Sequence, residues 1–196
     1  MTGTKKLLLK YIYERCGKKM SGLIHIYTGD GKGKTSAATG LAVRCAGSGR
    51  KVLYAQFLKK EDSCELPMLD QLAGIERMRC EKCFGFTFQM SEETKKEARR
   101  FYTEYFQSVV EKVAGENAAS YGLLVLDELV TAYAADLVEW ERVLEFLQQK
   151  PEELEIAMTG RNAMPELIEL ADYVSEIRKV KHPFDRGIGA RRGIEM

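Results

Sequence analysis

A glycine-rich stretch follows the first apolar run of the chain and has the residue types of a phosphate-binding loop. It reads Thr28-Gly29-Asp30-Gly31-Lys32-Gly33-Lys34-Thr35-Ser36. Glycines let a backbone fold back and aim its amides at a phosphate chain, and a following helix adds its positive N-terminal end. Lys34 supplies a mobile cation, and the hydroxyl of Thr35 can reach a magnesium ion. The stretch therefore predicts a nucleoside phosphate site, with a glycine turn that binds nothing as the alternative.

Two carboxylates end the most apolar run of the sequence. Leu123–Leu126 is continuously apolar, and Asp127 and Glu128 follow it directly. In phosphate-loop proteins, acidic groups at a strand end hold magnesium directly or through water. Consecutive strand residues point to opposite sides, so the two carboxylates should have different roles. We expect Glu128 on the magnesium side and Asp127 as a partner of the loop; an acid-rich helix N-terminus is the alternative.

Groups that could act as a general base are scarce in this chain. Its only histidines are His25 and His182, and His25 lies within an expected strand, where a packed histidine is the simpler interpretation. A kinase or hydrolase needs a group that positions the attacking hydroxyl or water. The sequence offers no Ser–His–Asp or Cys–His combination. We therefore expect a substrate that is already a strong nucleophile.

The pattern of apolar residues predicts the elements that must hold these groups. Strands are expected at Leu23–Tyr27, Val52–Phe57, Ile75–Met78, Leu123–Leu126, Glu155–Met158 and Tyr173–Ile177, and helices at Lys34–Ala46, Glu92–Ala114, Asp136–Gln148 and Pro165–Leu170. Such alternation predicts an α/β three-layer sandwich around a mostly parallel sheet of about six strands, like that of the RecA-like phosphate-loop NTPases. Ligands of such sheets lie outside the carboxyl ends of the strands, where both motifs stand. We expect residues 1–20 to form a basic, amphipathic appendage and residues 21–196 to form the domain.

Composition limits the class of protein further. The 196 residues are 45% hydrophobic and 30% charged, the balance of a globular domain, and their net charge is only +1. Bulk positive charge is thus excluded as a binding device, and we expect no nucleic-acid partner. No apolar run reaches the roughly 18 residues of a membrane span, and Lys10 interrupts the short run Leu7–Leu9 before a signal-peptide core could form. With an odd number of cysteines, five, reduced thiols and a cytoplasmic location are expected.

Several motifs together resemble one family. In chain order they are the phosphate loop, Arg44, Gln56–Lys59, Gly85–Thr87, Leu126–Leu129, Thr159–Arg161, Glu169–Arg178 and Val180–Asp185. Over about residues 22–195 the chain resembles the phosphate-loop type of ATP:corrinoid adenosyltransferase, the cob(I)yrinic acid a,c-diamide adenosyltransferase family. Thr28 stands where the standard loop has glycine, and the family shares this departure.

The resemblance implies a reaction and its participants. The 5′-deoxyadenosyl group of ATP would move to the cobalt of a reduced, cob(I) corrinoid, giving adenosylcobalamin or its precursor and triphosphate. Cobalt(I) is a strong nucleophile, in line with the missing base. ATP is then the co-substrate and Mg²⁺ or Mn²⁺ the metal, with a flavoprotein or other low-potential reductase as electron donor and a homodimer as the assembly.

The resemblance also implies roles for single residues. The loop from Thr28 to Ser36 and Arg44 would bind ATP, with Lys34, Thr35 and Glu128 as catalytic residues. Thr35, Glu128 and Asp127 would hold the metal, and Phe86, Thr87 and Phe88 the corrinoid. Phe86 would lie against the lower face of the corrin and keep cobalt four-coordinate.

Two positions depart from the family pattern. Some members have tryptophan where this chain has Phe88. Others have a polar residue and a tyrosine where it has Val130 and Thr131. A contact near the acidic pair is then either lost or rebuilt by a neighbour such as Tyr133.

Alternative functions and sites stay open at this point. A phosphate-loop kinase or ATPase would release ADP, and a nucleotide-dependent corrinoid carrier would form no cobalt–carbon bond. Ordinary strand packing is the alternative role for Phe86 and Phe88. Cys80 and Cys83, with Cys64 as a third thiolate, resemble part of a zinc site that lacks a fourth ligand.

Overall fold

The core of the protein is a six-stranded sheet in which every neighbouring pair of strands is parallel. The computed structural model describes residues 21–60, 62–85, 87–115 and 121–195, so the expected appendage at residues 1–20 lies outside the described residues. The strand order is β3-β2-β4-β5-β1-β6. The strands are β1 (Ile24–Thr28), β2 (Lys51–Gln56), β3 (Ile75–Met78), β4 (Tyr121–Asp127), β5 (Glu155–Thr159) and β6 (Tyr173–Glu176).

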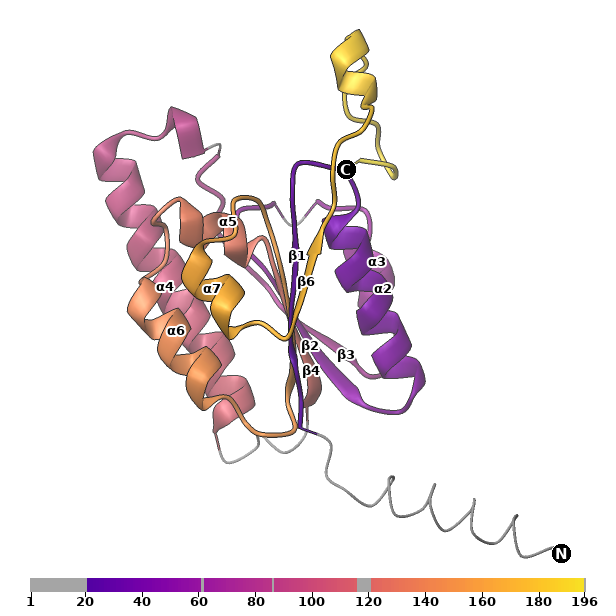
Figure 1. Ribbon diagram of the computed structural model, residues 1–196, viewed down its shortest axis with the longest axis vertical. Helices are drawn as coiled ribbons and strands as arrows, with labels where there is room; N and C mark the ends of the chain where they lie inside the picture. The colour runs from indigo at the N-terminus through magenta and orange to yellow at the C-terminus, as the bar shows by residue number, and fades with distance from the viewer. Residues whose placement is uncertain (1–20, 61, 86, 116–120, 196) are drawn as a thin grey trace, which may run out of the picture.

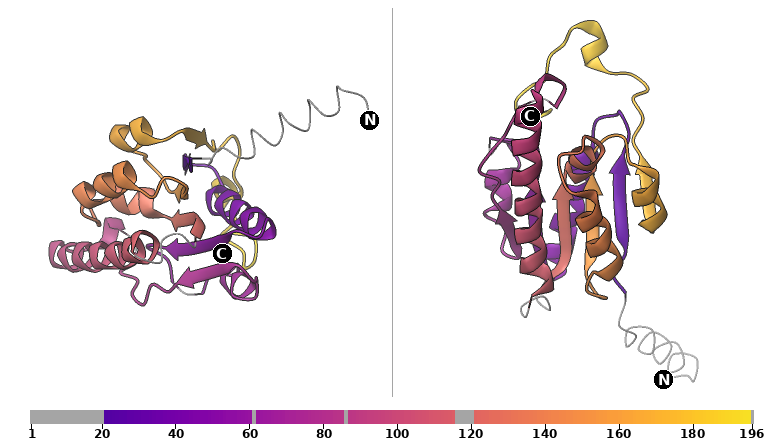
Figure 2. Two further views of the ribbon diagram at one scale, coloured as in Figure 1. Left: turned by 90° about the horizontal axis from the view of Figure 1, so that it is seen from below. Right: turned by 90° about the vertical axis from the view of Figure 1, so that its left-hand side faces the viewer.

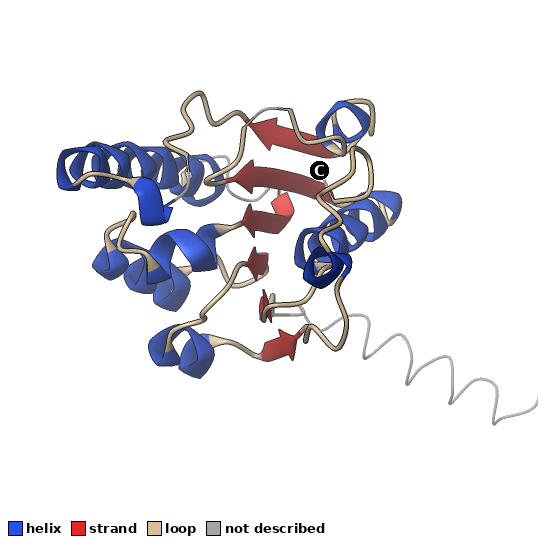
Figure 3. Cartoon of the chain, turned by 90° about the horizontal axis from the view of Figure 1, so that it is seen from above, coloured by secondary structure: helices blue, strands red, loops and turns tan. Residues whose placement is uncertain are grey.

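Helices cover both faces of the sheet and complete three layers (Figure 1). One face carries α2 (Lys34–Gly47) and α3 (Leu66–Leu69); the other carries α4 (Glu92–Ala114), α5 (Leu129–Ala134), α6 (Trp140–Gln149) and α7 (Pro165–Leu170). Figures 2 and 3 show the same division from other directions. The 3-10 turns η1 (Thr87–Gln89) and η3 (Pro183–Arg186) lie in connections outside the sheet. The predicted α/β three-layer sandwich around a parallel sheet of six strands is confirmed.

Burial explains why these segments form the central elements. The side chains of Leu123–Leu126 in β4 are at most 1% exposed, because β2 and β5 flank this strand and helices cover both faces. Helix α4 buries one stripe, and the hydroxyl of Ser91 accepts the backbone N–H of Thr94 at its start (3.2 Å). No helix among the described residues is long and apolar enough to cross a membrane.

One helix begins later than its apolar pattern predicts. We expected a helix from Asp136, but α6 starts at Trp140. Asp136 has φ of 54°, a left-handed conformation that a helix cannot include, and it follows the end of α5. The short helices α3 and α5, of four and six residues, were not among the predicted elements.

The strand order determines where chemistry can take place. The chain leaves β1 through α2 on one face and returns to the sheet centre through α4 on the other face. Loops after β1, β2, β4 and β5 therefore meet at the carboxyl ends of neighbouring strands, where ligands of parallel sheets bind. The segment after β6 rises beyond the same ends (yellow in Figure 1).

Candidate functional site

The glycine-rich loop joins β1 to α2 and packs against the chain that leaves β6. Gly29 has φ of 103°, and a Cβ there would lie 2.4 Å from the carbonyl oxygen of Ile177. The N–H of Gly31 donates to that same oxygen at 2.7 Å. Gly33 has φ of 122° and directly precedes α2, which begins at Lys34. Glycine is therefore required at Gly29 by both a close contact and the backbone conformation.

Lys34 is buried at the start of α2. The residue is only 7% exposed, and its Nζ donates to the carbonyl of Gly31 at 2.8 Å. Burial lowers the pKa of the Lys34 ammonium, and the nearby guanidinium of Arg161 lowers it further. A poorly solvated cation inside a phosphate loop gains from an anionic ligand, so the position suits phosphate binding.

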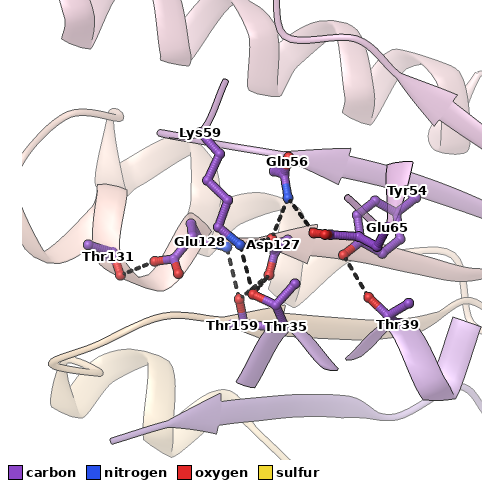
Figure 4. Close-up of polar contacts among 10 residues, drawn as sticks. All are labelled: Thr35, Thr39, Tyr54, Gln56, Lys59, Glu65, Asp127, Glu128, Thr131 and Thr159. Atoms are coloured by element: carbon purple, nitrogen blue, oxygen red, sulfur yellow. Dashed lines mark hydrogen bonds and ion pairs between the residues drawn. The ribbon is translucent and has the colours of Figure 1, made fainter. Parts of the chain in front are cut away.

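Asp127 is the polar centre of the site. It is fully buried, and each of its carboxylate oxygens accepts two hydrogen bonds (Figure 4). Oδ1 accepts from the hydroxyls of Thr35 (2.9 Å) and Thr159 (2.7 Å). Oδ2 accepts from Nε2 of Gln56 (2.9 Å) and Nζ of Lys59 (2.8 Å). The carboxylate thus joins the phosphate loop to the ends of β2 and β5.

Glu128 turns away from Asp127 because its backbone is left-handed, with φ of 61°. Its N–H donates to the hydroxyl of Thr159 (2.9 Å), and its carboxylate accepts from the hydroxyl of Thr131 (2.6 Å). The contact near the acidic pair that the sequence left undecided is therefore made by Thr131. Tyr133 instead donates to Glu166 at 2.9 Å. A left-handed non-glycine residue is costly, and such residues cluster at functional sites.

These residues border a pocket of about 310 Å³ at the carboxyl ends of the strands. Its wall combines the loop residues Asp30–Ser36 with Lys59, Glu128, Arg161 and the C-terminal residues His182–Phe184, Ile188–Ala190, Ile194 and Glu195. The C-terminal segment is tied to the loop, because the N–H of Lys179 donates to the carboxylate of Asp30 (2.8 Å) and lowers its pKa. The pocket is therefore cationic and amide-rich on one side and partly apolar on the other.

The donor set suits magnesium. Thr35 and Glu128 both border this pocket, and the Thr35 hydroxyl is hydrogen-bonded to the carboxylate of Asp127. Oxygen ligands are what Mg²⁺ prefers, and it usually takes one or two carboxylates together with substrate phosphates. Within the described ranges, no three His, Cys, Asp or Glu side chains gather as a complete metal site. The described cysteines therefore form no such group either. The thiol of Cys80 donates to the carbonyl of Lys82, and the thiol of Cys83 donates to the carbonyl of Leu58.

Comparison with known proteins identifies the family of this chain. The family model described as ATP:corrinoid adenosyltransferase BtuR/CobO/CobP matches residues 20–196. The chain belongs to this family. It is 36% identical over 174 residues to the corrinoid adenosyltransferase of Escherichia coli strain K12, covering 89% of this chain and 85% of that protein. The corrinoid adenosyltransferase of Pseudomonas aeruginosa is 35% identical over 182 residues, covering 89% of this chain and 84% of that protein.

Not every residue that the adenosyltransferase resemblance named is brought to the pocket. Arg44 is exposed in the last turn of α2, ten residues after Lys34, and a helix rises about 1.5 Å per residue. The structure therefore does not place Arg44 near the loop. Phe86 lies outside the described residues, as does the side chain of Phe88. Thr87 begins η1, in the connection that follows the carboxyl end of β3.

Other residues of the site had no role assigned from the sequence. They are Gln56, Lys59, Thr131, Thr159 and Arg161. Four of them stand in motifs that carry the family resemblance, and that was the available signal. Thr131 had no such signal, because it departs from the residues expected there.

Proposed function

We propose that this protein transfers the 5′-deoxyadenosyl group of ATP to the cobalt of a corrinoid reduced to cob(I), giving adenosylcobalamin or its precursor and triphosphate. The observation that carries the proposal is the family match over residues 20–196, which includes every segment that borders the pocket. The burial of Lys34 at the loop and the oxygen donors of Thr35 and Glu128 add support.

The reaction needs little proton transfer from the protein. The electron pair of cobalt(I) attacks C5′ of ATP, a cobalt–carbon bond forms, and the bond from C5′ to oxygen breaks with its pair leaving on the triphosphate. The imidazole that borders the pocket, His182, already accepts the N–H of Phe184 through Nδ1 (3.1 Å) and caps η3. On this mechanism the protein's tasks are orientation of C5′ and stabilisation of the leaving group.

The residues of the loop perform the second task. Amides at the start of α2, the ammonium of Lys34 and the guanidinium of Arg161 offer fixed positive charge to the triphosphate. Magnesium or manganese, held by Thr35 and Glu128 with Asp127 behind them, would supply further charge neutralisation when bound. Asp127 orients the Thr35 hydroxyl, and Thr131 orients the Glu128 carboxylate.

For the corrinoid we propose the segment around η1. Thr87 and Phe88 open this turn, and Phe86 precedes it. The segment joins β3 to α4, so it leaves the sheet at the same edge as the phosphate loop. An apolar wall on the lower face of the corrin would keep water from cobalt and favour the four-coordinate form that is reduced to cob(I).

Anaerobic spectroscopy with cob(I)alamin, ATP and Mg²⁺ tests the proposal. We expect the absorbance of adenosylcobalamin to appear with one triphosphate per cobalt–carbon bond. ADP as the product would mean a kinase or ATPase instead, and binding without a cobalt–carbon bond would mean a carrier. Lys34→Ala should abolish turnover, whereas Lys51→Ala, at the exposed start of β2, should retain it. Near-normal turnover of Lys34→Ala would contradict the placement of the leaving group.

We also propose the two partners that the family implies, a second copy of the chain and a flavoprotein or other low-potential reductase. We propose a cytoplasmic location as well. Light scattering of the purified protein tests the dimer, and turnover from cob(II)alamin with a reduced flavoprotein tests the electron donor. Comparing cobyrinic acid a,c-diamide with cobalamin as acceptor decides between synthesis and salvage.

A further inference from the structure

Lys59 places a positive charge between the phosphate loop and the acidic strand end. Its Nζ donates to the hydroxyl of Thr35 (2.8 Å) and to Oδ2 of Asp127 (2.8 Å) (Figure 4). Asp127 has a fully buried side chain, while that of Lys59 is 28% exposed. A buried carboxylate needs a counter-charge, and Lys59 is the cation that pairs with it.

The backbone before Lys59 is shaped to bring it there. Leu58 has φ of 59°, which is uncommon for a bulky residue and marks a sharp turn after β2. Two contacts hold this turn: the N–H of Phe57 donates to the carbonyl of Asp127 (2.8 Å), and the thiol of Cys83 donates to the carbonyl of Leu58 (3.5 Å). Lys59 therefore returns over the end of β4 instead of extending into solvent.

The atoms that Lys59 contacts belong to the proposed metal site. A hydroxyl has one donor hydrogen and two lone pairs. The hydrogen of Thr35 goes to Oδ1 of Asp127, and one lone pair accepts from Lys59. An ammonium at hydrogen-bond distance from this oxygen and a divalent cation on the same oxygen would be like charges a few ångströms apart, a strongly repulsive arrangement.

We propose that Lys59 is an exchangeable internal cation, which occupies the Thr35–Asp127 position until a divalent metal replaces it. The proposal rests on the proposed function for the identity of the metal site. Lys59 borders the same pocket as Lys34 and Arg161, so a bound triphosphate offers its ammonium a new anionic partner there. The metal should therefore bind weakly to the protein alone and much more tightly together with ATP, because only the nucleotide compensates the displaced lysine.

Binding of Mn²⁺ without nucleotide or corrinoid tests this directly. Lys59→Met keeps an unbranched side chain of similar shape and removes the charged terminal nitrogen. We expect it to bind Mn²⁺ alone at least about tenfold more tightly than the wild type, measured by electron paramagnetic resonance of free Mn²⁺. Lys60→Met, at the exposed next residue, is the matched control and should bind as the wild type does. Unchanged Mn²⁺ affinity of folded Lys59→Met would overturn the proposal.

A second variant keeps the test decisive if Lys59→Met does not fold. Lys59→Gln retains a donor for Asp127 without the charge. Its melting temperature should rise with Mn²⁺ concentration, whereas that of the wild type should stay nearly constant. Variants that remain unfolded with and without Mn²⁺ would show a structural counter-ion that metal does not replace, and would overturn the proposal. Because neither ATP nor corrinoid is present, these outcomes are independent of whether the adenosyl transfer itself occurs.

Discussion

Removing the hydroxyl of Thr131 tests how the site holds Glu128. This hydroxyl donates to the Glu128 carboxylate (2.6 Å) and accepts the N–H of Arg161 (2.9 Å). Thr131→Val keeps the shape of the side chain but loses both hydrogen bonds. A bond to a charged group contributes about 1.5–3 kcal/mol and a neutral one about 0.5–1.5 kcal/mol. Because the bond to Glu128 is only partly buried and the one from Arg161 is exposed, we expect the lower end of the sum, a loss of about 2 kcal/mol in the free energy of unfolding.

The same substitution should weaken the use of metal. Without Thr131 the Glu128 carboxylate is free to rotate, and loss of a group that orients a metal ligand typically costs 10–100-fold in metal affinity or activity. We expect the Mg²⁺ concentration for half-maximal adenosyl transfer to rise about tenfold. Urea unfolding gives the stability, and a Mg²⁺ titration of turnover gives the metal dependence.

Two matched variants separate this explanation from general damage. Thr131→Ser retains the hydroxyl and should keep the wild-type Mg²⁺ dependence. Tyr133→Phe removes a hydroxyl that contacts Glu166 instead, so its Mg²⁺ dependence should also be unchanged. A wild-type Mg²⁺ dependence in Thr131→Val would refute the assignment of Thr131 as the residue that positions Glu128.

Three further predictions concern the loop, the core and the corrinoid segment. Gly29→Ala should lower the free energy of unfolding by at least about 2 kcal/mol, since the added Cβ would meet Ile177 and φ is positive. Gly47→Ala, whose added Cβ would lie in open space, should change it by less than about 1 kcal/mol. Equal losses for the two variants in urea unfolding would contradict the close contact of Gly29 with Ile177. Burial raises the pKa of Tyr54 above the unfolded value near 10, so stability is lost as pH rises past about 10. The free energy of unfolding of Tyr54→Phe, from urea unfolding, should therefore fall less steeply there, by up to about 1.4 kcal/mol per pH unit, and parallel slopes would refute this. Phe86→Ala should retain ATP binding but form less four-coordinate cob(II)alamin, and an unchanged spectrum of the ATP complex would exclude its role.

Local patterns in the sequence predicted the fold well because they carry its main determinants. Strand β3 and helices α4 and α7 have the predicted bounds, and the other strands agree to within two residues. Each of these elements either shows a clear apolar pattern or is bounded by residues that end a helix or a strand. The start of α6 was predicted too early because the left-handed backbone of Asp136 follows from its tertiary setting, which apolar spacing does not encode.

The site was predictable only where its residues are contiguous. The loop and the pair Asp127 and Glu128 each lie within one short motif. Lys59 and Thr159 reach Asp127 because their strands, β2 and β5, flank β4. For Lys59 the register also matters, since Gln56 at the end of β2 pairs with Asp127 at the end of β4. Strand order and register are properties of the whole sheet, so the spacing of residues within one strand does not reveal such contacts.

The buried carboxylate of Asp127 also links the two substrate sites that we propose. Any ligand that moves Thr35 or Lys59 changes the partners of Asp127, to which both are hydrogen-bonded. Lys59 in turn follows the strained turn at Leu58, whose carbonyl accepts from Cys83, three residues before Phe86. Occupation of the phosphate loop is therefore joined by direct contacts to the start of the proposed corrinoid segment. In a chain with a net charge of only +1, this local pairing of charges, and not a general positive surface, is what the proposed site offers to a polyanion.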